Sequence, residues 1–267
     1  MSRPLAGLVA AWLGAVAVAQ TPAPETPEPK AGPQLRRDAE AVKRLEAYDA
    51  LQYLPVDAGL KDISFSVALP TGVILDIRWK SPDKVAWTPR LAKEVPKEAE
   101  RVWLLQFETP KFKAEVDAQV QSFLKSVIGE KTASKYSKDE VRRVAPDQVQ
   151  IVAVAPETAA MMREATLTFD PRGLVTAIKV VSPVGAVTDM EQSYRAKGDK
   201  FLLEQVKMTN PGPTGPMTTT MKLEYAEVGA YVLVKKMELS AEDQKPAALE
   251  FSDMKVDQGL KDEDFRK

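Results

Sequence analysis

The hydrophobic and polar positions of this chain repeat with two periods, one typical of helices and one typical of strands. From Gln34 to Leu54, apolar residues recur near helical spacing, which predicts a helix. The period then changes to two. Ile63 to Leu69 and Val73 to Trp79 alternate between apolar and polar residues on either side of the turn Pro70-Thr71-Gly72. This pattern predicts a hairpin.

Two more strands and a helical insert are predicted to follow the hairpin. One strand contains Val85 to Trp87, and a fourth covers Arg101 to Glu108. An apolar stripe from Phe112 to Ile128 then predicts a helix that packs on a sheet and ends at Gly129. Ser137 to Glu140 matches a capping box, which predicts the start of a short second helix.

From Gln148 to Val256 the pattern predicts one strand after another. Asp170 to Gly173, Lys197 to Lys200 and Val228 to Ala230 have the residue types of tight turns, and Asn210 to Pro216 is predicted to be a mobile rim loop. The strands are predicted at Val149 to Ala155, Glu164 to Phe169, Leu174 to Val181, Ala186 to Ala196, Phe201 to Met208, Met217 to Glu227, Tyr231 to Ser240 and Leu249 to Val256.

A sheet with this many strands twists and has edges that need protection. We therefore expect an α+β fold. It is a strongly curved antiparallel sheet, an incomplete β-barrel, with a few helices packed in or over its concave face. Residues 1–19 are predicted to be a signal peptide, residues 20–33 a Pro-rich disordered linker, and residues 34–267 a single domain.

The N-terminal residues predict export. Arg3 precedes the apolar run Leu5 to Val18, and Ala17-Val18-Ala19 has the small-x-small pattern of a cleavage site. An uncleaved N-terminal anchor is the alternative, although the run is shorter than the roughly 20 residues of a transmembrane helix. We expect a soluble periplasmic protein that is cleaved near Ala19.

Composition narrows the possible chemistry. The chain has no histidine and no cysteine, and its formal charge is −1. Ser-His and Cys-His nucleophile pairs, His-ligated zinc and an acylated cysteine anchor are therefore excluded. A nearly neutral chain also has no broad attraction to nucleic acid. We expect no cofactor and no bound metal.

Catalytic alternatives have weak support. Ser122 with Lys125, and Ser81 with Lys84, match the S-x-x-K spacing of serine acyl enzymes, but the partner motifs S-D-N and K-T-G are absent. A hydrolase would need one of these serines beside its lysine in a cleft. The remaining carboxylate groups are interpreted as solvated faces or helix-start charges, and a calcium site in the last of them lacks the spacing of a calcium loop. These groups are Asp139-Glu140, Glu242-Asp243 and Asp262-Glu263-Asp264.

Three segments of the chain resemble the LolA/LolB-like superfamily of periplasmic lipoprotein-sorting carriers and their sensor relatives. Trp79 to Trp87 is similar to a family strand that ends in a Pro turn. Leu167 to Ile178 is similar to its hairpin with a Gly turn, and Phe251 to Phe265 to its closing tail. The resemblance implies an incomplete barrel lidded by helices, with an apolar cavity for acyl chains. It also implies transient membrane contact and a membrane-bound donor or acceptor protein.

We therefore expect a non-catalytic carrier for a lipid or acylated protein, whose helices move aside as a lid. The alternative is an envelope scaffold or sensory domain that docks a partner protein through the same sheet. Aromatic and methionine side chains on predicted strands are core residues by default, and some are expected to line a cavity because they suit acyl chains of variable shape. The candidates are Phe65, Trp79, Trp87, Trp103, Phe107, Met190, Tyr194 and Met221.

Overall fold

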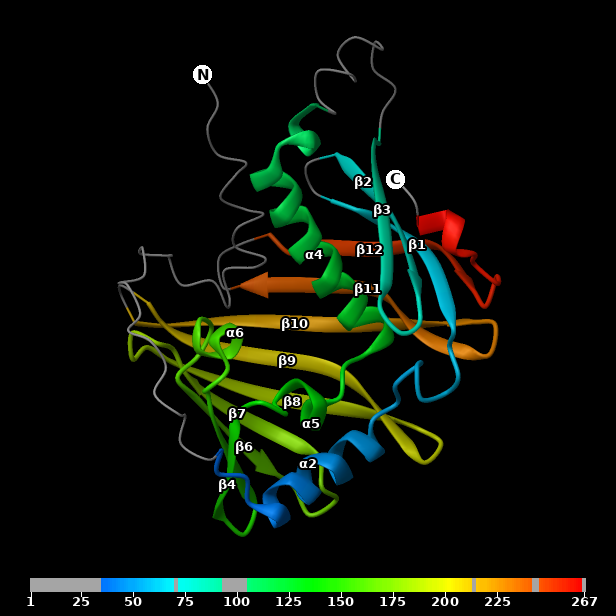
Figure 1. Ribbon diagram of the computed structural model, residues 1–267. Coiled ribbons are helices and arrows are strands. Elements are labelled where there is room, and N and C mark those ends of the chain that lie inside the picture. Colours follow the sequence, from blue (N-terminus) through cyan, green and yellow to red (C-terminus); the bar gives the residue numbers. More distant parts are fainter. Residues whose placement is uncertain (1–34, 70–71, 93–104, 213–214, 242–244, 266–267) are drawn as a thin grey trace. The chain divides into compact units, whose positions relative to one another are not determined.

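The computed structural model describes residues 35–69, 72–92, 105–212, 215–241 and 245–265 (Figure 1). Within these ranges the strands form one open antiparallel sheet of twelve strands in the order β3-β2-β1-β12-β11-β10-β9-β8-β7-β6-β5-β4. The predicted α+β class and the open antiparallel sheet are thus confirmed. The strands are β1 Asp62–Ala68, β2 Val73–Lys80, β3 Lys84–Leu91, β4 Glu140–Ala145, β5 Gln148–Val152, β6 Glu164–Phe169, β7 Val175–Val181, β8 Val187–Lys197, β9 Lys200–Gly212, β10 Gly215–Val228, β11 Tyr231–Ala241 and β12 Ala247–Val256. The helices are α2 Ala39–Leu51, α4 Pro110–Ile128, α5 Thr132–Lys135 and α6 Pro156–Ala159, with 3-10 turns η1 Leu105–Glu108 and η2 Asp262–Phe265.

Four local predictions are wrong. Residues 105–108 of the predicted fourth strand form η1, while residues 101–104 lie outside the described residues. The capping box at Ser137 to Glu140 does not open a helix, because α5 precedes it and β4 starts at Glu140. The predicted strand to Ala155 ends at Val152. Finally, β9 and β10 extend into the segment predicted to be a loop, up to Gly212 and from Gly215.

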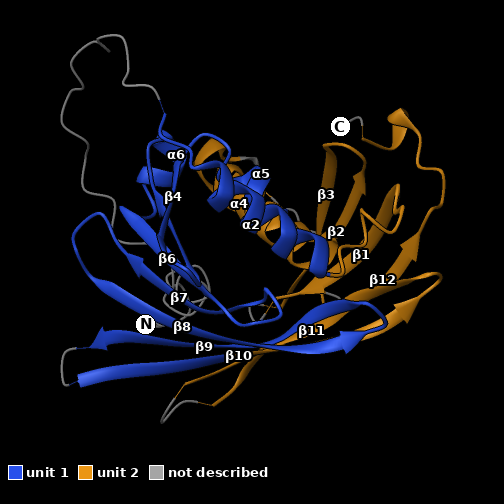
Figure 2. Cartoon of the chain, turned by 90° about the horizontal axis from the view of Figure 1, so that it is seen from below, with its two compact units in different colours: residues 1–52, 131–220 blue, residues 53–130, 221–267 orange. Residues whose placement is uncertain are grey.

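The chain divides into two compact units, coloured separately in Figure 2. Unit 1 comprises residues 1–52 and 131–220, and unit 2 comprises residues 53–130 and 221–267, so the boundary falls within β10. Each unit has a core of its own, and the two are described separately.

The core of unit 1 joins helix α2 to the first strands of the meander. Asp38 caps α2, since its side chain accepts hydrogen bonds from the N–H groups of Glu40 and Ala41. Three apolar side chains of α2 are buried, namely Ala41, Leu45 and Tyr48. They share a buried cluster with Val141, Val149, Ile151, Met162, Ala165, Leu167, Phe169, Leu174 and Val175.

The core of unit 2 contains buried side chains of strand β2 and of helix α4. Strand β2 alternates strictly between buried and half-buried positions, as the sequence predicts for a strand with one covered face. The apolar stripe of α4 is also confirmed, and the helix ends at Gly129, where φ is +81°. The buried α4 residues are Val116, Val120, Phe123, Leu124 and Val127.

Candidate functional site

One continuous apolar row crosses five strands of unit 1. Residues that lie directly opposite in an antiparallel pair share a face of the sheet. Met190 of β8 pairs with Ile178 of β7 on one side and with Met208 of β9 on the other. Ile178 pairs in turn with Leu167 of β6, which pairs with Val149 of β5. The row thus runs across one face without a polar interruption.

The exposed fraction of the side chains differs along this row. Val149 is 0% and Leu167 4% exposed, because both belong to the buried cluster that includes α2. Ile178 and Met190 are only half-buried. The neighbouring Val180 of β7 and Tyr194 of β8 are half-buried as well and pack against the same cluster. We call Ile178, Val180, Met190 and Tyr194 the half-covered strip.

A hydroxyl network marks the end of the strip that is next to α2. The Tyr194 hydroxyl lies 2.9 Å from the Tyr48 hydroxyl, 2.8 Å from the Val175 carbonyl oxygen and 2.7 Å from Gln192 Oε1. Burial raises the pKa of Tyr48 to about 12, and the hydrogen bond with Tyr194 opposes this shift. The Tyr48 hydroxyl is therefore neutral at physiological pH, and this end of the strip lies beside an uncharged polar group.

Helix α2 is held at both ends by side chains that bond to the backbone of a distant segment. Before α2, one guanidinium nitrogen of Arg37 donates to the carbonyl oxygens of Tyr136, Ser137 and Asp139 at 2.7–2.9 Å. In the last turn of α2, the Asp49 carboxylate is 5% exposed and accepts hydrogen bonds from the N–H groups of Thr132 and Ala133, both at 2.8 Å. These contacts were not predicted, because they join positions 83 to 102 residues apart.

Two of the predicted cavity residues are buried in the core of unit 2. Phe65 and Trp79 are 2% and 4% exposed. The Phe65 ring lies 5.9 Å from that of Phe251, which meets Phe123 of α4 edge-on at 6.2 Å. In this conformation the chain's own side chains cover both predicted residues.

Trp87 and Phe107 lie together beside the start of α4. Their ring centroids are 6.1 Å apart, and Phe107 meets Phe112 edge-on at 4.9 Å. The indole N–H of Trp87 donates to the carboxylate of Asp117 at 2.6 Å. Trp87 and Phe107 are both half-buried, so this aromatic group keeps some accessible surface.

The other predicted lining residues are distributed over both units. Met190 and Tyr194 belong to the half-covered strip of unit 1, and Met221 is a half-buried residue of β10 in unit 2. Trp103 lies outside the described residues. Within unit 1, Ile178 and Val180 join the two predicted residues. The alternation of β7 signals their face, but nothing in the sequence signals their partial exposure.

Neither S-x-x-K match is arranged for nucleophilic catalysis. Ser81 and Ser122 are exposed. The ammonium of Lys84 pairs with Asp262 at 2.6 Å, and that of Lys125 pairs with Glu130 at 2.7 Å. Each lysine therefore pairs with an acidic residue at the surface, and neither ammonium is bonded to the serine of its motif.

The structure describes two of the three acidic clusters, and carboxylates of both bond to other parts of the chain. Asp139 was interpreted as a solvated or helix-start charge, and this is wrong, since its side chain is 0% exposed. It accepts hydrogen bonds from the N–H groups of Val154 and Ala155 and from the Thr158 hydroxyl, at 2.9–3.0 Å. Glu242-Asp243 lies outside the described residues. Among those described, no three Asp or Glu side chains gather in a way that could hold a metal ion.

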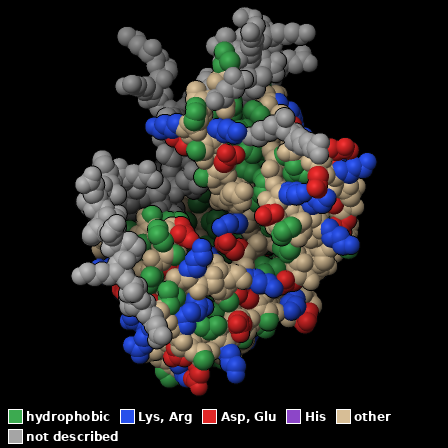
Figure 3. Space-filling model, in the orientation of Figure 1, with side chains coloured by type: hydrophobic (Ala, Val, Ile, Leu, Met, Phe, Trp, Pro, Cys, Tyr) green, Lys and Arg blue, Asp and Glu red, His purple; other side chains and the backbone are tan. Residues whose placement is uncertain are grey.

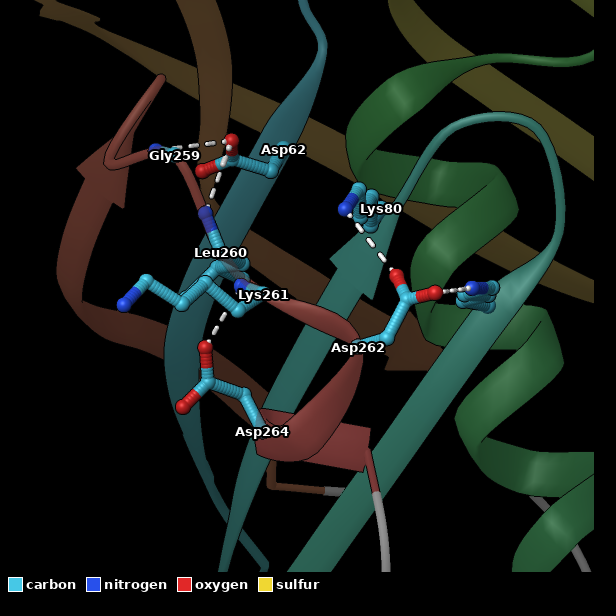
Figure 4. Close-up of polar contacts among 8 residues, drawn as sticks. Asp62, Lys80, Gly259, Leu260, Lys261, Asp262 and Asp264 are labelled. Atoms are coloured by element: carbon cyan, nitrogen blue, oxygen red, sulfur yellow. Dashed lines mark hydrogen bonds and ion pairs between the residues drawn. The ribbon is translucent and has the colours of Figure 1, made fainter.

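The C-terminal tail of unit 2 is attached by carboxylates. Figure 4 shows Asp62 of β1 directed at the backbone N–H groups of Gly259 and Leu260, at 3.0 and 3.3 Å. Asp262 lies beside Lys80 in the same view, and hydrogen bonds from Lys84 and Lys80 lower the pKa of its carboxyl. The cluster Asp262 to Asp264 thus serves to fasten the tail.

Charges of both signs are interspersed on the face shown in Figure 3. This distribution fits the formal net charge of −1 and offers no broad field of one sign to a nucleic acid. Within the described ranges, no helix combines the length and apolar composition needed to cross a bilayer. The predicted signal peptide lies outside those ranges.

Comparisons with protein-family models, with curated proteins and with solved structures give no match to this chain. The resemblance to the LolA/LolB-like superfamily therefore stays a prediction.

Proposed function

We propose that this protein is a non-catalytic binding protein or carrier for an acyl chain that belongs to a lipid or a lipoprotein. The half-covered strip is the observation that carries the proposal. Ile178 and Met190 are the half-buried members of an apolar row whose other residues, Val149, Leu167 and Met208, are buried. Apolar side chains left half-open beside a packed core offer a surface that a hydrocarbon chain can complete.

An acyl chain along β7 and β8 would remove water from both the strip and its own methylene groups. Burial stabilises the complex by about 0.8 kcal/mol for each CH₂ group. Met190 suits this contact, because an unbranched thioether side chain adapts to ligands of different shape. The strip contains no charged side chain, so binding would not require desolvation of an ion.

In this proposal the acyl chain lies beside α2 rather than beneath it. Arg37 and Asp49 tie the two ends of this helix to the segment around α5. Lifting α2 as a lid would break these bonds and uncover the buried cluster of unit 1. The proposal also retains the expectations of a curved, incomplete barrel with helices over its concave face, and of export to the periplasm.

The first experiment is titration of the protein with a fluorescent fatty acid. In parallel, lipids are extracted from the purified protein and identified by mass spectrometry. The variant Met190→Asp places a charge in the strip, and Ser193→Asp places the same charge on the opposite, exposed face of β8. We expect M190D to weaken fatty-acid binding roughly tenfold or more, and S193D to change it by less than about twofold.

A second variant distinguishes loss of the binding surface from misfolding caused by the added charge. Ile178→Trp fills the strip without adding a charge and should also weaken binding, while circular dichroism reports whether each variant folds. Absence of binding to any apolar probe by the wild-type chain would refute the carrier function and favour the docking alternative. Equal binding by M190D and S193D would refute the assignment of the strip.

A further inference from the structure

The connections between strands in unit 1 alternate between two ends of its sheet, because successive strands are antiparallel. At one end lie the β4–β5, β6–β7 and β8–β9 turns, which contain Asp147, Asp170 with Arg172, and Asp199. At the other end lie the β5–β6 connection through α6, the β7–β8 turn and the ends of β9 and β10 (Figure 1). The two ends differ in chemistry.

Exposed apolar side chains gather at the second end. Of the eight large apolar residues that are exposed in the described part of the chain, four belong to it. Val154 and Met161, on either side of α6, are 47% and 43% exposed. Val184 of the β7–β8 turn is 74% exposed, and Met217 near the start of β10 is 50% exposed. We call these four residues the apolar rim.

Charge is scarce around the apolar rim. The β7–β8 turn, residues 182–186, has no charged side chain, and neither do residues 208–212 and 215–221 at the ends of β9 and β10. Charges do occur beside α6, but they face partners of opposite sign. Lys138 lies 3.7 Å from Glu157, and Arg163 lies 3.5 Å from Glu164.

Three backbone N–H groups of the β7–β8 turn form hydrogen bonds within the turn. The N–H of Ser182 donates to the Ala186 carbonyl at 2.8 Å, and the N–H of Gly185 donates to the Ser182 carbonyl at 2.9 Å. The N–H of Ala186 also donates to the Ser182 hydroxyl oxygen at 3.0 Å. Unpaired backbone groups make entry into hydrocarbon costly, and this turn has already paired three of its N–H groups.

We propose that the apolar rim docks on the surface of a phospholipid bilayer, with the side chain of Val184 entering the boundary between headgroups and acyl chains. A bilayer fits better than a protein partner, because the exposed residues are separate tips that present few polar groups for pairing across an interface. The lack of charge specifies a neutral, zwitterionic surface rather than an anionic one.

Docking on a bilayer is a property separate from acyl-chain binding. It would also set the end of the half-covered strip at which an acyl chain enters. Val180 of the half-covered strip lies four residues before Val184 and pairs with Thr188 across the turn. If the proposed function holds, an acyl chain leaving the bilayer at the rim would meet Val180 first, and then Ile178 and Met190. Only this route of entry depends on the proposed function; docking of the apolar rim does not.

The test uses the full chain, which contains no native cysteine. Val184→Cys is labelled with an environment-sensitive NBD fluorophore, and Asp199→Cys at the opposite end of the sheet is the matched control. Each protein is mixed with phosphatidylcholine vesicles at low and high salt. We expect the emission of the Val184 probe to rise severalfold and shift to the blue, independently of salt, while the Asp199 probe stays unchanged.

The other outcomes overturn the proposal. An unchanged Val184 probe excludes docking by the rim, and equal changes at both positions indicate adsorption without orientation. A response that needs anionic lipid contradicts the neutral surface. A response that depends on protein concentration without vesicles identifies a second copy of the chain as the occupant. Fatty-acid titration needs no vesicles, so its result distinguishes failure of docking from failure of ligand binding.

An unlabelled pair of variants tests the same surface by vesicle flotation. Val184→Asp should reduce the bound fraction on phosphatidylcholine vesicles roughly tenfold, because a charge at the tip resists entry into the bilayer. Val144→Asp, at a 50% exposed position beside the β4–β5 turn of the opposite end, should leave it unchanged. Equal loss in both variants would contradict the proposal.

Discussion

Replacing Asp139 by alanine should destabilise unit 1 strongly, although a charge is being removed. The carboxylate is completely buried and accepts three hydrogen bonds that hold the β5–β6 connection, from Val154, Ala155 and Thr158. In Asp139→Ala these donors lose their acceptor. Val154 is exposed, so its N–H regains water, while the donors of Ala155 and Thr158 stay buried.

The magnitude follows from these two buried donors. A buried donor without a partner costs about 1–3 kcal/mol, so the pair costs about 2–6 kcal/mol. Asp139→Ala also removes the unfavourable burial of a carboxylate, which offsets part of this loss. We therefore expect the free energy of unfolding to fall by about 3 kcal/mol. Asp139→Asn should lose about half as much, because one oxygen still accepts the two backbone N–H groups.

Urea unfolding monitored by far-UV circular dichroism measures this difference. The control is Asp147→Ala, in the exposed β4–β5 turn, which should change the free energy of unfolding by less than about 0.5 kcal/mol. Hydrogen exchange at Val154 and Ala155 should also accelerate in Asp139→Ala. A loss below about 1 kcal/mol in Asp139→Ala, or equal losses in the Asp139 and Asp147 variants, would refute the reasoning.

Two further predictions concern alkaline pH and helix termination. Burial raises the pKa of Tyr48 from about 10 in the unfolded chain to about 12, so its contribution is complete below pH 10 and is lost as the pH rises through 12. The free energy of unfolding should thus fall over this range, less steeply in Tyr48→Phe than in the wild type, and identical slopes would contradict the assignment. Gly129→Ala should lower the melting temperature more than Gly185→Ala. Both have positive φ, which costs about 1–2 kcal/mol, but only at Gly129 does an added Cβ lie 2.4 Å from Leu54.

Local pattern predicted most of the strands, because alternation reports directly which side chains face a covered surface. The hairpin of β1 and β2 and the meander from β6 to β12 follow it closely. Prediction failed at Ser137 to Glu140, where a capping box is a short-range signal. There the Asp139 carboxylate bonds to residues 15 to 19 positions later instead of capping its own segment.

The candidate site could be predicted only in part. Met190 and Tyr194 could be predicted because aromatic and methionine side chains on strands suit acyl chains of variable shape. Ile178 and Val180 were not, because isoleucine and valine on a strand indicate only a core. Phe65 and Trp79 have the same sequence signal as Met190, yet unit 2 buries them completely against its own side chains.

The sequence by itself determined the type of fold and the available chemistry. Its period of two encoded the strands, and the lack of histidine and cysteine removed most nucleophiles and metal ligands. Only the tertiary structure decided which residues of the apolar row stay half-buried, because that depends on which strands pack in one cluster with α2. It also decided that the uncharged turns gather at one end of the unit 1 sheet. Pairing between distant strands, which no local pattern records, places them there.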